Sequence, residues 1–147
     1  MGNQPVVVGV DGSPDSVRAL RWAHRYAELV DAPVRVVTAY APPASYGGIY
    51  AMGALTDSDK IAEDARQMLT RAVDEALGDG ASVMAHIEHG HPSKVLVEAS
   101  HDAQALVIGT RGHGGFVGMV LGSVSQYCVA RATCPVVVLP HERPEQP

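Results

Sequence analysis

A run of glycines in the carboxyl-terminal third of the chain has the composition of a phosphate-binding loop. Residues 109–125, GTRGHGGFVGMVLGSVS, contain Gly109, two residues, Gly112, nine residues, and then Gly122-Ser123. Glycine adopts positive φ and lets a ligand approach the main chain, so such a loop turns several N–H groups toward one anion. A helix that begins at Ser123 also favours negative charge at its amino end. We call residues 109–125 the glycine segment and predict that it holds the phosphates of a nucleotide.

Two common phosphate-binding motifs are absent from the glycine segment. A Walker A loop needs GxxxxGK followed by Ser or Thr, and the segment contains no lysine. The dinucleotide fingerprint GxGxxG follows the first strand of its fold, whereas these glycines come late in the chain and do not match the six-residue pattern. We therefore expect neither a P-loop NTPase nor a Rossmann dehydrogenase.

Asp11 is a second candidate for chemistry, because it directly follows the apolar run Val6–Val10 and precedes Gly12-Ser13-Pro14. Its carboxylate is either a turn residue before the next helix or a ligand group. As a ligand group it accepts hydrogen bonds from a ribose hydroxyl or holds a divalent cation beside the phosphates. The residue types alone leave both interpretations open.

Seven histidines raise the question of a metal site, above all His86, His89 and His91. If they continue one strand, His89 and His91 share a face while His86 points away, so three converging ligands are not expected there. His113 lies inside the glycine segment, where it either touches a phosphate or is solvated.

No nucleophile and base pair stands at a recognisable spacing, so we predict no catalytic residues. Ser123 and Ser125 flank the start of a predicted helix, where serine caps far more often than it attacks. Cys128 and Cys134 have no further Cys/His pair at zinc spacing, which favours two buried, reduced thiols.

Length and composition predict one domain, residues 1–147, with a core over 5–140 and a disordered tail at 141–147. The chain is 46% hydrophobic with a formal net charge of −5, which argues against nucleic acid or an anionic membrane as a partner. No apolar run approaches the ~20 residues of a membrane span, and MGNQPVVV lacks a basic leader. We expect a cytoplasmic location.

Hydrophobic patterning and turn residues predict five strands that alternate with four helices. The strands are expected at 6–10, 34–39, 83–89, 105–108 and 135–139, and the helices begin at Pro14, near residues 57–58, at Pro92 and at Ser123. The strand at 83–89 alternates between polar and apolar residues, as an edge strand does. A Pro/Gly/Tyr-rich loop occupies residues 41–57, and its length is typical of a functional or a disordered segment.

Such alternation predicts an α/β fold: a doubly wound, five-stranded parallel sheet of order 3-2-1-4-5 with helices on both faces. In that order the winding reverses between the first and fourth strands, and ligands bind at the carboxyl ends of strands at such a switch point. Asp11 and Gly109 follow those two strands. Both candidate elements are therefore expected at one place.

Together, the opening VVVGVDGSPDS, the GTRGHGG stretch, the nine-residue spacer, the GSVS helix start and the closing CPVVVLP resemble the universal stress protein family, whose fold is of the adenine nucleotide alpha hydrolase type. The resemblance covers residues 5–140. In that family, the pattern Gly109, two residues, Gly112, nine residues, Gly122-Ser123 separates members that bind ATP from those that do not.

The resemblance implies a set of nucleotide contacts. Asp11 would lie near the ribose or a phosphate-bridging Mg²⁺ or Mn²⁺, and main-chain groups of Thr38 and Ala39 would meet the adenine. Because the spacer offers only His113 as a basic residue, AMP and cyclic AMP stay open beside ATP. The residues that would surround the ribose and phosphates are Gly109, Thr110, Arg111, Gly112, His113, Gly114, Gly115, Gly122, Ser123, Val124 and Ser125.

The function that follows is a nucleotide-linked regulator or sensor in stress response. The family also implies a homodimer, and the apolar strand 135–139 at a sheet edge independently favours pairing across a two-fold axis. Any ATP hydrolysis is expected to be slow, because no positioned base or arginine finger is evident. The alternatives are an enzyme of adenylyl or phosphoryl transfer at the same site and a dimerisation module without nucleotide.

Overall fold

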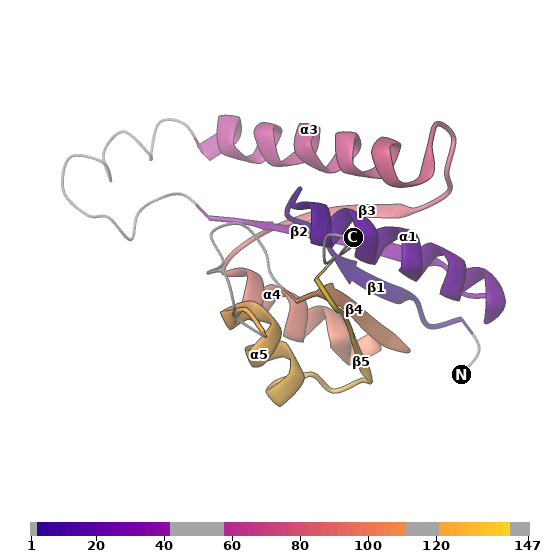
Figure 1. Ribbon diagram of the computed structural model, residues 1–147. Helices are drawn as coiled ribbons and strands as arrows, with labels where there is room; N and C mark the ends of the chain where they lie inside the picture. The colour runs from indigo at the N-terminus through magenta and orange to yellow at the C-terminus, as the bar shows by residue number, and fades with distance from the viewer. Residues whose placement is uncertain (1–2, 42–57, 111–120, 142–147) are drawn as a thin grey trace, which may run out of the picture.

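The computed structural model describes residues 3–41, 58–110 and 121–141. These residues form a single parallel sheet in the order β3-β2-β1-β4-β5, with helices on its two faces (Figure 1). The predicted fold class and strand order are confirmed. The strands are β1 (Val6–Gly9), β2 (Val34–Tyr40), β3 (Met84–His89), β4 (Ala105–Gly109) and β5 (Val136–Leu139).

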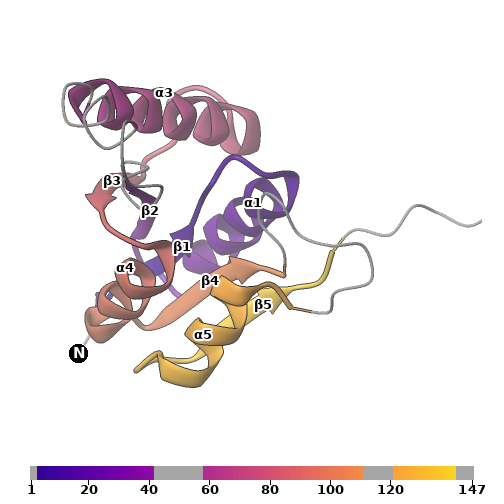
Figure 2. The ribbon, with the colours of Figure 1, turned by 90° about the vertical axis from the view of Figure 1, so that its left-hand side faces the viewer.

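The helices divide between the faces as a doubly wound sheet requires (Figure 2). On one face lie α1 (Pro14–Leu29) and α3 (Ser58–Leu77). On the other lie α4 (Pro92–Ala99), the short 3₁₀ helix η2 (Ser100–Asp102) and α5 (Ser123–Arg131). Successive residues of the central strands face opposite cores: Val6 and Val8 pack under α1, and Val7 packs on the α4 and α5 side.

Helix α1 begins where its sequence predicts. Ser13 is the N-cap, and its hydroxyl accepts a hydrogen bond from the Ser16 N–H at 3.2 Å. Pro14 occupies the first turn, where its missing N–H costs no hydrogen bond. The predicted start of α1 and the predicted cap are both confirmed.

The two outer strands differ in character. In β3 every side chain is exposed or half-buried, which confirms the predicted edge strand. In β5, all four residues of the sequence VVVL are only half-buried, although the neighbouring strand β4 is almost entirely buried. An apolar strand with one uncovered edge is a place where another chain can pair.

The expectation that His89 and His91 share a strand face was wrong. Strand β3 ends at His89, Gly90 adopts a φ of 145°, and His91 is the N-cap of α4. The His91 Nδ1 accepts the Ser93 N–H at 3.2 Å. Within the described residues no three His, Cys, Asp or Glu side chains gather as a metal site.

Both cysteines are free thiols, as expected. Cys128 is fully buried against the sheet, whereas Cys134 is only half-buried. No helix in residues 3–41, 58–110 and 121–141 has the length and apolarity that crossing a bilayer would need.

Burial raises the pKa of the Cys128 thiol from 9.0 to about 11. Since the unfolded thiol ionises first, the stability from this group is complete below pH 9 and is lost as the pH rises toward 11. We expect the urea midpoint of Cys134→Ser to fall more steeply between pH 9 and 11 than that of Cys128→Ala/Cys134→Ser. Parallel curves for the two variants would contradict the burial effect.

Candidate nucleotide-binding site

The carboxyl ends of β1 and β4 lie side by side at the switch point. The two strands pair in parallel, with Val6 opposite Ala105 and Val8 opposite Val107. Asp11 follows β1 and Gly109 ends β4. The structure therefore brings these two predicted elements to the same edge of the sheet. Arg111, Gly112, His113, Gly114 and Gly115 lie outside the described residues.

The two ends of the glycine segment meet directly. The Gly122 N–H donates to the Thr110 carbonyl oxygen at 2.7 Å, which places the start of α5 next to the end of β4. Gly122 is the N-cap of α5, with φ −72° and ψ 169°. The amino end of α5 therefore opens at the edge of the sheet where Asp11 also lies.

Helix α5 begins without a side-chain cap, in contrast to α1 and α4, which are capped by Ser13 and His91. The Gln126 N–H donates to the Gly122 carbonyl oxygen at 3.0 Å, and the N–H groups before it have no acceptor inside the helix. These are the main-chain N–H groups of Ser123, Val124 and Ser125. Together with the helix dipole they suit a phosphate group.

Other polar groups of the glycine segment are bonded to the chain itself. The Ser125 hydroxyl donates to the Gly109 carbonyl oxygen at 2.8 Å, with the Thr110 carbonyl oxygen at 3.2 Å. The Thr110 N–H and hydroxyl both donate to the Leu139 carbonyl oxygen, at 3.1 and 2.6 Å. These groups shape the loop, and their assignment as nucleotide contacts stays a prediction.

Asp11 takes the turn geometry that was one of its two interpretations. Its Oδ1 accepts the Ser13 N–H at 2.9 Å, and Gly12 between them has a φ of 85°. The residue is nevertheless exposed, so the turn fixes the carboxylate at the mouth of the site. An exposed carboxylate suits a ribose hydroxyl or a hydrated Mg²⁺ or Mn²⁺, and either role stays a prediction.

Thr38 and Ala39 lie at the end of β2, next to the site. The Thr38 side chain is buried and its hydroxyl donates to the Val10 carbonyl oxygen at 2.8 Å. The Tyr40 carbonyl oxygen accepts from Gly90 on the β3 side. Because main-chain groups alternate along a strand, those of Ala39 point the other way, past the end of β1. This orientation suits the predicted main-chain contact with adenine.

Two residues beside the site, Asp15 and His141, were not anticipated. The Asp15 side chain is 5% exposed, and the His141 Nδ1 lies 2.9 and 3.0 Å from its two carboxylate oxygens. The prediction that the tail is disordered from residue 141 onward is wrong at its first residue. Residues 142–147 lie outside the described part. No sequence pattern pairs residues 126 positions apart.

Gly109 is required by close packing rather than by its φ angle. A Cβ atom at this position would lie 2.8 Å from the Asp15 Cβ and 3.1 Å from the Asp15 carbonyl carbon. The end of β4 therefore rests directly on the first turn of α1. The glycine spacing has a steric reason at Gly109 in addition to any role in ligand binding.

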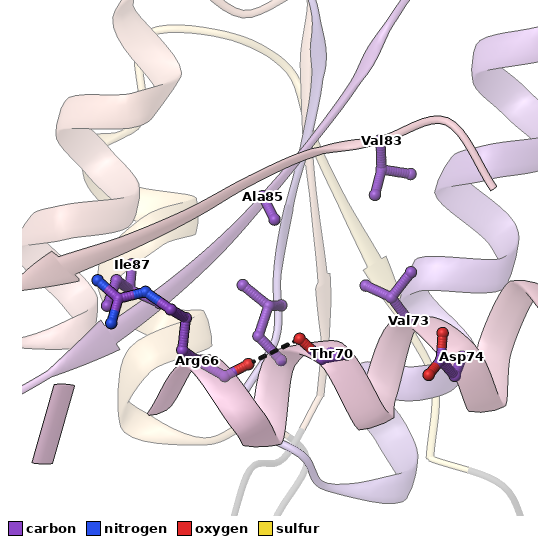
Figure 3. Close-up of a pocket in the computed structure, with 8 residues that line it drawn as sticks. Arg66, Thr70, Val73, Asp74, Val83, Ala85 and Ile87 are labelled. Carbon is purple, nitrogen blue, oxygen red and sulfur yellow. Dashed lines mark hydrogen bonds between the residues drawn. The ribbon is translucent and has the colours of Figure 1, made fainter. Parts of the chain in front are cut away.

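Two hollows that described residues line lie away from the glycine segment. One, of about 190 Å³, lies between α3 and the edge strand β3 (Figure 3). Its Thr70 hydroxyl donates to the Arg66 carbonyl oxygen at 3.0 Å, and the Arg66 guanidinium pairs with Glu63 at 3.2 Å. Its remaining lining is largely apolar: Leu69, Val73, Val83, Ala85 and Ile87, with Asp74 at the rim. Its two polar groups that could meet a phosphate, the Arg66 guanidinium and the Thr70 hydroxyl, are bonded to Glu63 and to the helix main chain.

The family model for universal stress proteins matches residues 2–140. This chain belongs to the universal stress protein family. A universal stress protein of Mycolicibacterium smegmatis is 36% identical over an alignment of 141 positions, which covers 91% of this chain and 47% of that protein. The chain spans about half the length of the curated relatives it matches.

Solved structures of the family share the fold. A universal stress protein in complex with cAMP has a TM-score of 0.67 and 29% identity, over 95% of this chain and 98% of that one. The universal stress protein of Archaeoglobus fulgidus in complex with dAMP has a TM-score of 0.66 and 32% identity, over 94% and 98%. The ligand in each of those two complexes is an adenine nucleotide.

Replacing Gly109 with Ala tests the contact with α1. The added methyl group meets main-chain and Cβ atoms of Asp15, which have little freedom to move. We expect the free energy of unfolding to fall by about 1–3 kcal/mol, the usual cost of overpacking. Urea denaturation measures this change, and an unaltered midpoint would show that β4 and α1 are less closely packed.

Proposed function

We propose that this universal stress protein binds ATP at the carboxyl edge of its sheet and acts as a nucleotide-linked regulator in stress response. The observation that carries the proposal is the uncapped start of α5, which lies at the same edge of the sheet as the Asp11 turn. Main-chain N–H groups from Ser123 to Ser125 would bind a phosphate. Asp11 would accept from the ribose or hold Mg²⁺ or Mn²⁺ beside the phosphates. The complexes of two relatives with cAMP and dAMP support an adenine nucleotide.

The proposal also specifies how many phosphates the bound nucleotide carries. One helix start with three available N–H groups suits a single phosphate group. A triphosphate needs further donors, and the residues that could supply them are in the glycine segment at 111–120. The complete glycine pattern favours ATP, while AMP and cAMP are the competitors that the binding experiment includes.

The same proposal includes a homodimer that pairs through β5. This strand has apolar side chains that are only half-buried and one edge without a neighbour in the described sheet. A second copy would cover both its edge and its side chains. The free thiols of Cys128 and Cys134 fit a reducing compartment such as the cytoplasm.

Ser123→Pro removes one proposed phosphate donor and little else. Proline is favoured at the first helical position, and Gly122 already has the extended conformation that proline requires of its predecessor. A hydrogen bond to a charged group contributes about 1.5–3 kcal/mol, so we expect at least ~10-fold weaker ATP binding by calorimetry.

Ser123→Ala is the matched control, because it removes the hydroxyl but keeps the N–H, and it should bind nearly as well as the wild type. Titrations with AMP and cAMP alongside ATP rank the three ligands. If Ser123→Pro is folded by circular dichroism and binds all three with wild-type affinity, the start of α5 does not hold the phosphate.

Sizing tests the dimer. At micromolar concentration we expect a particle of about twice the 15.4 kDa chain mass, because pairing removes the exposed apolar strand from water. Sedimentation velocity measures this directly. A species of one chain length throughout the concentration range would contradict pairing through β5.

A further inference from the structure

Thr110 joins three elements at the mouth of the proposed nucleotide site. Its N–H and its hydroxyl both donate to the Leu139 carbonyl oxygen at the end of β5, at 3.1 and 2.6 Å. Its own carbonyl oxygen accepts the Gly122 N–H at 2.7 Å, where α5 begins. The residue is 7% exposed. Every polar group of Thr110 therefore has a partner within the chain.

These bonds join the end of β4 to the end of β5 and to the start of α5. Thr110 follows β4 and Gly122 is the N-cap of α5, so the bond between them sets where the N–H groups of α5 lie relative to β4. A loop whose ends are fixed before the ligand arrives loses less conformational entropy on binding. The Thr110 hydroxyl contributes to this by holding its end of the loop on β5.

The residues that follow β5 are in turn bonded to α1, and these bonds fix the position of the end of β5. The Arg18 guanidinium donates to the Pro140 carbonyl oxygen at 2.8 Å. The next residue, His141, contacts both carboxylate oxygens of Asp15. Asp15 itself packs under Gly109. The contacts thus form a closed ring from β4 through β5 and α1 back to β4.

We infer that Thr110 is a positioning residue for the nucleotide: its hydroxyl holds the end of β4, and with it the start of α5, on β5 and does not contact the ligand. This inference rests on the proposed function. It differs from the resemblance, which implies Thr110 as part of the ligand shell. It also gives the Asp15–His141 pair a role in binding, since that pair supports the same end of β5.

The test measures ATP affinity by calorimetry at 10 °C, together with thermal stability, for Thr110→Val and Thr110→Ser. Loss of one neutral hydrogen bond predicts about 3- to 10-fold weaker binding for the valine variant. The serine variant keeps the hydroxyl and should bind like the wild type. The matched control is Thr70→Val, which loses the same kind of hydroxyl-to-carbonyl bond on α3 (Figure 3) and should not change affinity.

His141→Ala provides a second variant outside the glycine segment, in case Thr110→Val does not fold. We expect about 2- to 5-fold weaker ATP binding, because the end of β5 loses its contact with Asp15. The double variant Thr110→Val/His141→Ala should lose less affinity than the product of the two single losses. Both changes affect the same structure, the end of β5. A direct ligand contact at Thr110 would instead make the losses multiply.

The outcomes separate the two proposals. If the wild type binds ATP and both Thr110→Val and His141→Ala bind it equally well, with only a lower melting temperature, Thr110 is merely structural and the inference is overturned. If the wild type binds neither ATP, AMP nor cAMP, the proposed function fails and the inference fails with it.

Discussion

The parallel pairing of β1 with β4 is the constraint on which the site depends. Val6, Val7, Val8, Leu106 and Val107 are all fully buried at this junction, and burying such side chains stabilises a fold by about 1.5–3 kcal/mol each. This central pair cannot slip without exposing one of the two cores. The pairing of β1 with β4 therefore fixes where Asp11 and the glycine segment leave the sheet, at a buried and rigid position.

Around that point the polar groups divide into two kinds. The hydroxyls of Thr110 and Ser125 and the N–H groups of Thr110 and Gly122 are bonded to carbonyl oxygens of the chain. Among the described residues, the first N–H groups of α5 have no carbonyl acceptor inside their helix and no side-chain cap. The first kind determines the shape of the loop, and the second provides the electrostatic attraction for an anion. In a chain with a net charge of −5, the proposed phosphate binding would depend on such local main-chain donors.

The glycines of this chain serve different physical needs. Gly12, Gly78 and Gly80 adopt positive φ, and nothing lies near the side-chain position of the last two, so their need is conformational. Gly109 instead permits the end of β4 to rest on the first turn of α1. The glycine pattern of residues 109–123 therefore contains at least one residue that close packing requires.

Local patterns in the sequence determined the elements and, through the βα alternation, the sheet order and the place of the candidate site. These patterns act within a few residues, so the sequence alone could identify them. Periodicity identifies the apolar runs, and residue type identifies the Ser13-Pro14 cap and the glycines after α3. The sequence predicted that the third strand ends at residue 89, but only the tertiary structure decided that Thr110 is bonded to Leu139 and that His141 contacts Asp15. The last two contacts join residues 29 and 126 positions apart. Such pairs form only after the sheet has assembled, because packing of α1 and β5 against β4, and no local preference, brings them within reach.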